Sequence, residues 1–231
     1  VPTPFDDSGQ VDEASIDTLV DFVIGSGVAG MTILGVAGEA SKLTDAERLT
    51  VIERMLGRAA GRVPICVGIN AGSTLASLAY AKMAAAAGAH SVMLAATPGT
   101  QPSDDAIARH YFTVAEAVSI PIVIQDHPNY NGVRMSIDLL KSITSASPNL
   151  KVIKLEATPT PPKIAQIRAA MPDVAVLGGL GGIMLLEELR HGASGTMTGV
   201  GIPEVLVEIV GRHLSGRSEE HTSELQSRSV I

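Results

Sequence analysis

The sequence is poor in cysteine and in aromatic side chains: among 231 residues it has one Cys, no Trp, three Tyr and three Phe. A single thiol, Cys66, excludes a disulfide within the chain and is typical of proteins from a reducing compartment. Because aromatics are scarce, the core must be built mainly from Ala, Val, Ile, Leu and Met. With 45% hydrophobic residues, the composition is that of a globular protein rather than a disordered one.

Long apolar runs are also missing. No stretch approaches the roughly 18 consecutive apolar residues that a membrane-spanning helix requires. The first four residues, Val-Pro-Thr-Pro, lack the basic and apolar regions of a secretory signal peptide. We therefore expect a cytoplasmic protein without a membrane partner.

Positive charge is scarce and scattered. The chain has 17 Lys and Arg against 24 Asp and Glu, a formal net charge of -7, and its basic residues form no cluster. This balance argues against a nucleic-acid partner. The six histidines show no metal-ligand spacing, so we expect neither a metal site nor a cofactor.

Short apolar, β-branched runs alternate with helix-patterned stretches along most of the chain. Seven runs are predicted strands, with a stub at Val1 to Thr3 as an eighth: 30–35, 64–69, 91–96, 121–125, 150–155, 174–177 and 195–198. Such alternation requires parallel strands, and eight units in about 215 residues favour an α/β fold of the closed (β/α)8 TIM-barrel type. An open doubly wound sheet is the rival, but no strand is followed by a complete G-x-G-x-x-G or P-loop motif.

The stretches between the strands carry helix signals. Asp12 precedes an apolar stripe, and Thr44 with Glu47 has the spacing of a capping box. Further helices are predicted over 73–87, 103–118, 137–145, 161–170, 182–191 and 203–214. The apolar periodicity stops after Leu214. We therefore assign residues 1–214 to one barrel domain and expect 215–231 to be a non-native tail, with a natural polar extension as the alternative.

Of the six lysines, Lys154 alone lies in the interior of a predicted strand, whereas Lys151 opens that same strand. The two-residue repeat of a strand places it on one face with Val152 and Glu156. If that face is the barrel interior, burial favours the neutral amine, which is a nucleophile toward a carbonyl group. The alternative is a structural lysine paired with Glu156, but burying a charge for structure alone is costly. We therefore expect Lys154 to be catalytic.

Other strand ends carry further candidates, because a barrel holds its active site at the carboxyl ends of its strands. One candidate is the turn made of Gly35, Val36, Ala37, Gly38 and Glu39. Its two glycines allow backbone N–H groups to converge on an anion, although glycine pairs are also common in ordinary turns. At the end of 121–125, Gln125 and His127 are expected on one face. His127 is either an acid or base or a simply hydrogen-bonded histidine.

Glycines near two later strands leave a second kind of site open. Gly178 and Gly179 follow 174–177, and Gly199 and Gly201 follow 195–198. These are the usual positions of phosphate-binding loops in barrels. A phosphate-binding enzyme is therefore an alternative hypothesis.

In combination, these motifs resemble one family. The G-x-x-G-E turn at 35–39, the D-x-P turn at 126–128 and the I-K pair at 153–154 are similar to those of the dihydrodipicolinate synthase and N-acetylneuraminate lyase family. The resemblance runs from Thr3 to about Leu214 and implies a (β/α)8 barrel of class I aldolases that form homo-oligomers. It also implies a small C-terminal helical domain, which we expect to be missing here. By this resemblance Lys154 forms the Schiff base with pyruvate or another 2-keto acid, whose carboxylate the turn at 35–39 holds.

Departures from the family pattern bear on the substrate. Members that make dihydrodipicolinate relay protons through hydroxyl groups of residues that here are Val36, Ala37, Gly99, Thr100 and Gln125. Their arginine for the second substrate falls at Tyr130, with Arg134 as the candidate stand-in. The I-Q-D-x-P turn, the K-x-E element at 154–156 and the segment 192–199 are more similar to the L-2-keto-3-deoxyarabonate dehydratase branch, which however lacks the G-x-x-G-E turn.

We therefore expect a Schiff-base lyase that acts on pyruvate or a 2-keto-3-deoxy sugar acid, by dehydration or by aldol chemistry. Glu156 is the predicted base and Gln125 positions the substrate, while the expected binding residues beyond the turn are His127, Gly179 and Thr198. The alternatives are a 4-hydroxy-tetrahydrodipicolinate synthase proper, the phosphate-binding enzyme, or a sugar-acid binding protein without turnover.

Overall fold

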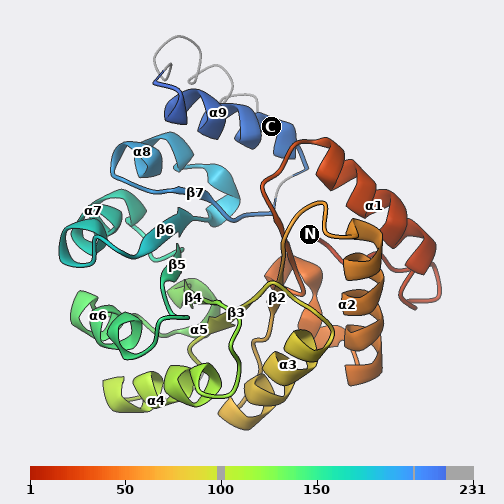
Figure 1. The fold of residues 1–231 in the computed structure, drawn as a ribbon, viewed down its shortest axis with the longest axis horizontal. Helices are drawn as coiled ribbons and strands as arrows, with labels where there is room; N and C mark the ends of the chain where they lie inside the picture. The colour runs from red at the N-terminus through yellow and green to blue at the C-terminus, as the bar shows by residue number, and fades with distance from the viewer. Residues whose placement is uncertain (98–101, 200, 217–231) are drawn as a thin grey trace.

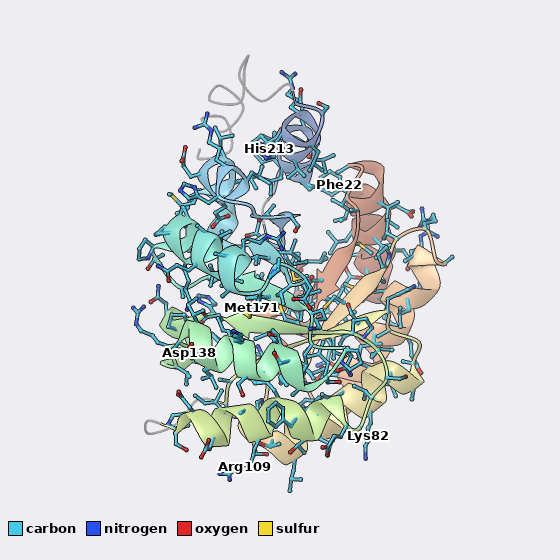
Figure 2. The ribbon with its side chains drawn as sticks, turned by 60° about the vertical axis from the view of Figure 1, so that its left-hand side comes forward. Phe22, Lys82, Arg109, Asp138, Met171 and His213 are labelled. Atoms are coloured by element: carbon cyan, nitrogen blue, oxygen red, sulfur yellow. The ribbon has the colours of Figure 1, made fainter. Side chains whose placement is uncertain are left out.

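The computed structural model describes residues 1–97, 102–199 and 201–216. Its centre is a parallel sheet of seven strands in the order β1-β2-β3-β4-β5-β6-β7, so that each strand pairs with the next one along the chain. The sheet curls, and the helices lie around its outer side (Figure 1). Long charged side chains of these helices, such as those of Lys82 and Arg109, point away from the sheet (Figure 2).

Strands and helices alternate as the sequence predicts. The strands are β1 Met31–Ile33, β2 Ile65–Gly68, β3 Ser91–Ala95, β4 Ile122–Asp126, β5 Val152–Leu155, β6 Ala175–Gly178 and β7 Gly195–Thr196. The α-helices are α1 Glu13–Gly25, α2 Asp45–Ala59, α3 Thr74–Ala86, α4 Asp104–Ala115, α5 Pro128–Asn131, α6 Ile137–Ala146, α7 Thr160–Ala170, α8 Leu185–Arg190 and α9 Pro203–Leu214. Short 3-10 helices are η1 Val36–Gly38, η2 Ala40–Lys42 and η3 Leu180–Gly182. Helix α5, a single turn one residue after β4, has no counterpart among the predicted helices.

The predicted eighth strand at Val1 to Thr3 is wrong, because this segment is not part of the sheet. Pro2 and Pro4 lack the N–H group that a strand donates to its neighbour, so the segment cannot build a regular ladder. It nevertheless lies beside β1. The nitrogen of Val1 donates to the carbonyl of Thr32 at 2.8 Å, and the hydroxyl of Thr3 donates to the carbonyl of Gly38 at 2.7 Å.

Both predicted helix starts are confirmed. The Asp12 side chain accepts the N–H of Ser15 at the start of α1. At the start of α2, Thr44 and Glu47 form the complete capping box, in which each side chain binds the backbone of the other. Such caps satisfy N–H groups that the first turn of a helix leaves without a partner.

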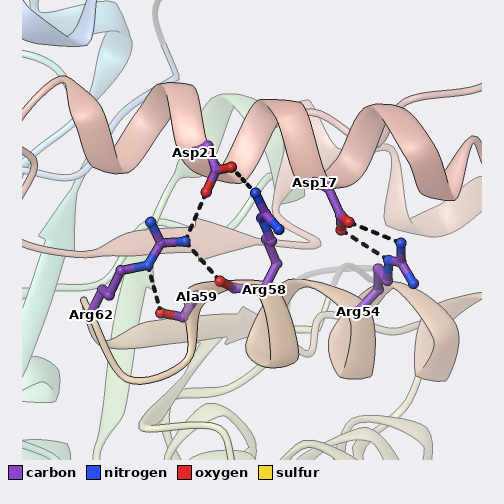
Figure 3. Close-up of polar contacts among 6 residues, drawn as sticks. All are labelled: Asp17, Asp21, Arg54, Arg58, Ala59 and Arg62. Carbon is purple, nitrogen blue, oxygen red and sulfur yellow. Dashed lines mark hydrogen bonds and ion pairs between the residues drawn. The ribbon is translucent and has the colours of Figure 1, made fainter.

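Ion pairs join α1 to α2 on the outer surface (Figure 3). Arg54 binds Asp17 through two hydrogen bonds of 2.9 Å, and Asp21 pairs with both Arg58 and Arg62. Hydrogen bonds from Arg58 and Arg62 lower the pKa of Asp21 to about 2. These pairs align the two helices. Because the charged groups are exposed to water, the pairs add little to stability.

Most of the buried side chains form two layers, and a small third cluster joins α8 to α9. The larger lies between the sheet and the helices and is aliphatic apart from Tyr111. The smaller lies inside the curl and contains Cys66, Met93 and Val123, with Val152 and Met197 packed against it. Burial raises the pKa of the Cys66 thiol to about 11, so this residue is part of the apolar floor rather than a nucleophile.

The two ends of the sheet come close through their connections. A Cβ atom at Gly199, after β7, would lie 3.4 Å from Cβ of Ala37, after β1. In the outer layer, Gly27, just past α1, lies against Val207 of α9. Figure 1 shows α9 next to α1.

No helix in the described part of the chain is both long enough and apolar enough to cross a membrane.

Candidate active site

Lys154 lies in β5 with its side chain on the inner face of the curled sheet. Two residues earlier, Val152 packs into the inner cluster, whereas Ile153 and Leu155 are buried in the outer core. The strand repeat therefore places Lys154 on the inside. Its side chain is only 11% exposed, so its amine is largely withdrawn from water.

Gln125 and Lys154 converge on the same oxygen atom. They are register partners on β4 and β5, and Gln125 is completely buried. The Gln125 Nε2 atom donates to Oε2 of Glu156 at 2.8 Å, and Nζ of Lys154 lies 3.1 Å from that oxygen. The structure thus brings the three predicted catalytic residues together, while their roles stay a prediction.

The backbone holds Glu156 in this position. Its N–H donates to the carbonyl of Asp126 at 2.8 Å, which extends the β4–β5 pairing by one residue. On its other side, the N–H of Leu180 makes a long hydrogen bond of 3.5 Å to Oε1. Glu156 therefore lies between the Lys154 ammonium and two N–H donors, those of Gln125 and Leu180. These groups stabilise a carboxylate, the form of the side chain that can accept a proton.

Asn70 belongs to the same group and was missed by the sequence analysis. Its Nδ2 atom donates to Oε1 of Gln125 at 3.0 Å, and its Oδ1 atom accepts the N–H of Ala95 at 2.7 Å. The available signal was its position two residues after Gly68, the end of β2, because strand ends form the site in such folds. A single asparagine among loop residues does not stand out without the partner that it meets.

A series of contacts links Glu156 to the glycine-rich turn after β1. Leu180 contacts Glu156, and the next residue, Gly181, donates its N–H to the Thr198 hydroxyl at 2.7 Å. Gly199, next to Thr198, lies against Ala37 of the turn. Hence the predicted binding residues Thr198 and Ala37 lie along one rim.

Within the turn 35–39, backbone N–H groups bond inside the turn, whereas the Glu39 side chain points outward. The N–H groups of Gly38 and Glu39 donate inside the turn, to the carbonyls of Gly35 and Val36. The side chain of Glu39 pairs with Lys42 and is 42% exposed. Glu39 as a side-chain ligand is therefore not supported, because its carboxylate points to solvent.

His127 lies directly before α5. Strand β4 ends at Asp126, and the His127 ring stacks on Tyr130 at 5.9 Å between ring centres. None of the contacts in the described part of the chain joins it to Lys154 or Glu156. The role of His127 in substrate binding therefore stays a prediction.

The candidate stand-in for an arginine, Arg134, lies elsewhere. It lines an open groove of about 400 Å³ between α7 and the segment before α6, together with Lys163 and Gln166. Lys163 forms an ion pair with Asp126, which neighbours Gln125 on β4 and therefore points to the opposite face. The groove is thus behind the strand rather than beside Lys154. Gly99 and Thr100 lie outside the described residues.

A second buried carboxylate, Glu188 of α8, lies on the opposite side of β6 from Glu156. A Cβ atom at Gly178 would overlap Glu188, and one at Gly179 would overlap Glu156. The Thr160 hydroxyl donates to Oε1 of Glu188 at 2.6 Å. Burial, and to a smaller extent the charge of Glu156, raises the pKa of Glu188.

Within residues 1–97, 102–199 and 201–216, no three His, Cys, Asp or Glu side chains gather in a way that could hold a metal ion. The polar side chains around the Lys154 ammonium are the amides of Gln125 and Asn70 and the carboxylate of Glu156. This set of groups suits proton transfer and imine chemistry.

Comparison with known proteins gives one consistent result. The model of the Dihydrodipicolinate synthetase family matches residues 1–228. A 4-hydroxy-tetrahydrodipicolinate synthase of Hydrogenobaculum sp. (strain Y04AAS1) is 30% identical over 222 residues, which cover 95% of this chain and 76% of the relative.

Solved structures agree. The dihydrodipicolinate synthase of Rhodopseudomonas palustris is 33% identical with a TM-score of 0.90, over 98% of this chain and 77% of that one. A monomeric dihydrodipicolinate synthase variant is 26% identical with a TM-score of 0.91, over 99% of this chain and 77% of that one. The chain belongs to the dihydrodipicolinate synthetase family, whose members are class I Schiff-base lyases.

Proposed function

We propose that this protein is a Schiff-base lyase of pyruvate or another 2-keto acid, with Lys154 as the residue that binds the substrate covalently. The observation that carries the proposal is the buried contact of 3.1 Å between Nζ of Lys154 and Oε2 of Glu156. Glu156 can accept the proton that the ammonium must lose before it attacks the ketone carbon. The amine adds to the carbonyl carbon and passes one proton to the ketone oxygen, and Glu156 returns the proton it accepted to the same oxygen. That oxygen leaves as water, and a protonated imine remains beside the restored carboxylate of Glu156.

The imine withdraws electrons from the adjacent carbon, so that a base can remove a proton from C3 and give an enamine. Glu156 is the base in this proposal, because its carboxylate lies beside the nitrogen of the imine. Gln125 donates to Glu156 and is the register partner of Lys154, so it can position the substrate. The substrate carboxylate binds at the turn 35–39, where the N–H groups of Val36 and Ala37 are the candidate donors.

We also propose that the seven strands belong to a (β/α)8 barrel. The proximity of Gly199 to Ala37 and of α9 to α1 supports closure. The segment Val1 to Thr3, which lies beside β1, would occupy the place of the remaining strand. In such a barrel the carboxyl ends of all strands face one opening, where Lys154 lies.

Two reactions can follow enamine formation. The first is condensation with an aldehyde, as in 4-hydroxy-tetrahydrodipicolinate synthase, and the names of the similar proteins favour it over the sugar-acid reaction. The side chains are less favourable. Val36 and Gln125 offer no hydroxyl group for a proton relay, and Arg134 lies behind β4 rather than beside the site.

The second reaction is loss of water from a 2-keto-3-deoxy sugar acid. It requires a base beside the imine and an acid for the departing hydroxyl group. The Lys154, Glu156 and Gln125 cluster favours it, because Glu156 can serve as the base and no second carboxylate needs to be bound.

The phosphate-binding alternative fits less well. Gly178 and Gly179 lie directly against the carboxyl groups of Glu188 and Glu156. A phosphate at these glycines would face two acidic side chains, which is unfavourable.

We also expect a homo-oligomer, although one similar solved protein is described as a monomeric variant.

Borohydride reduction tests the proposal. Treatment of the protein with borohydride and pyruvate should add one pyruvyl group to Lys154, detected by peptide mass spectrometry. Lys154→Arg should lose the adduct and keep its fold, because the charge is retained but no imine can form. The control is Lys151→Arg, which changes an exposed lysine of the same region that pairs with Asp173; it should be trapped normally.

Parallel assays with aspartate semialdehyde plus pyruvate and with 2-keto-3-deoxy sugar acids identify the second step. Glu156→Gln should lower turnover of the true substrate by about 100-fold or more, the size of a general-base contribution, while the borohydride adduct still forms. An adduct at another lysine, or no adduct with any 2-keto acid, would contradict the proposed function.

A further inference from the structure

The side chains around Lys154 form a continuous chain of hydrogen bonds that begins at the backbone. The N–H of Ala95 donates to Asn70 Oδ1 at 2.7 Å, Asn70 Nδ2 donates to Gln125 Oε1 at 3.0 Å, and Gln125 Nε2 donates to Glu156 Oε2 at 2.8 Å. All the donors point in one direction, from the β3 backbone to Glu156.

The first member fixes the direction of the others. A backbone N–H can only donate, so the atom of Asn70 that faces Ala95 must be its oxygen. The NH₂ group of Asn70 then faces Gln125, whose oxygen must accept, and the NH₂ group of Gln125 is left to face Glu156. An amide flip at either residue would place two donors or two acceptors against each other.

Burial makes such a flip costly. Gln125 is completely buried, and water therefore cannot replace a hydrogen bond that a flipped amide would lose. Chains of hydrogen bonds in a medium of low dielectric constant also strengthen one another. The direction of the chain is thus a stable property of the fold.

We propose that Asn70 is a positioning residue: it holds the Gln125 amide so that an N–H group faces Glu156, and thereby keeps Glu156 in the charged form that accepts a proton from Lys154. The inference rests on the proposed function of Lys154 and Glu156. Asn70 itself touches neither residue in the described contacts; it acts through Gln125.

Other groups also act on Glu156 and must be held constant. Lys154 faces it from β5, the N–H of Leu180 faces it from the segment after β6, and Glu188 lies behind β6 on α8. Among the described residues, none of them shares a hydrogen bond or ion pair with Asn70. A change at position 70 therefore reports on the amide chain.

Asn70→Asp reverses the chain with almost no change in size. One carboxylate oxygen still accepts the Ala95 N–H, but the other replaces the NH₂ group, so Gln125 turns its own NH₂ group toward position 70 and its oxygen toward Glu156. Glu156 must then be protonated to make that hydrogen bond. Asn70→Ala removes the constraint without adding charge, so Gln125 takes either direction.

The experiment measures turnover against pH and, separately, the protonation of Glu156. In Asn70→Asp, kcat should fall by about tenfold or more at neutral pH, which corresponds to about 1.4 kcal/mol of barrier. The acid limb of the pH profile, where kcat falls toward low pH, should move to higher pH. Asn70→Ala should shift in the same direction by less. Borohydride trapping of pyruvate at alkaline pH should persist in both variants.

Asn149→Asp is the matched control. Asn149 is also half-buried and uses its amide to bind two backbone carbonyls, those of Ala115 and Val118. Its own carbonyl accepts the N–H of Ile122, at the start of β4, whereas Gln125 lies near the end of that strand. The control variant should lower thermal stability without moving the acid limb. A purely structural role of Asn70 predicts the same behaviour for its variants, and that result would overturn the inference.

Carbon-13 NMR of carboxyl-labelled protein, with the Glu156 signal assigned by Glu156→Gln, gives a readout that needs no turnover. Uptake of a proton by Glu156 at higher pH in both Asn70 variants than in the unmodified protein supports the inference. Unchanged uptake in both folded variants refutes it. Absence of any adduct in the unmodified protein would instead refute the proposed function, so the two failures are distinguishable.

Discussion

Gly179 lies directly against Glu156: a Cβ atom at position 179 would be 2.5 Å from Cγ and 2.7 Å from Oε1 of that residue. Real side chains do not approach so closely, so any larger residue at 179 must displace the carboxylate from Lys154. The glycine after β6 is thus a condition for the geometry of the site.

Gly179→Ala should therefore reduce turnover strongly while the protein remains folded. A displacement of about 1 Å of a catalytic group can cost about 100-fold in rate. The measurement is kcat with the substrate identified by the assays above, with the circular dichroism spectrum as the check on folding. Normal kcat would show that Glu156 is not needed at its present position.

The matched control is Gly57→Ala. Gly57 lies within α2 in open space, so an added methyl group meets no neighbour. Because alanine loses less conformational freedom than glycine on helix formation, this variant should be more stable by about 0.5–1 kcal/mol with unchanged turnover.

Glu188→Gln should become increasingly stabilising as the pH rises. Burial raises the pKa of Glu188 in the folded protein above its unfolded value. The folded state thus holds this proton more tightly, and stability falls as the pH rises from the unfolded pKa through the folded one. Glutamine keeps the acceptor for Thr160 and removes this loss.

Thermal unfolding of both proteins from pH 4 to pH 8 measures the effect. The difference in Tm should be near zero at pH 4 and favour Glu188→Gln at pH 8, with about 2–4 °C for each kcal/mol in a chain of this size. A Tm difference that does not vary with pH would contradict the assignment of a raised pKa to Glu188.

Lys163→Met should destabilise the fold. Lys163 lies 2.5 Å from Asp126, whose side chain is 0% exposed, and also donates to the carbonyl of Met135 at 2.8 Å. Removal of the cation leaves a buried carboxylate without its partner, a change that costs about 3–5 kcal/mol. Urea unfolding measures this loss.

The double variant Asp126→Asn, Lys163→Met should recover most of the lost stability, because no charge is then left without a partner. Equal unfolding midpoints for the double variant and for Lys163→Met would show that the ion pair contributes little.

The relatives and the fold bear out part of what the sequence predicts. The family follows from three short motifs at strand ends, and the inward face of Lys154 follows from the two-residue repeat around Val152. The substrate is less determined. The names of the similar proteins support the synthase alternative better than the sugar-acid hypothesis, and the two assays proposed above decide between them.

The sequence by itself determined the alternation of strands and helices, the capping of α1 and α2, and the position of Lys154 within a strand. These features depend on local periodicity and on neighbours a few residues apart. It misled at the N-terminus, where Pro2 and Pro4 prevent a ladder, and it did not indicate the short helix α5.

Only the tertiary structure decided which side chains meet. Gln125 faces Lys154 because β4 and β5 pair in one register, and a shift of one residue would turn every side chain of a strand to the other face. Asn70 reaches Gln125 from two strands away because the sheet curls, and Glu156 and Glu188 come to opposite sides of β6 because two glycines leave room for them. Contacts between distant segments depend on register, curvature and space, none of which has a local signature in the chain.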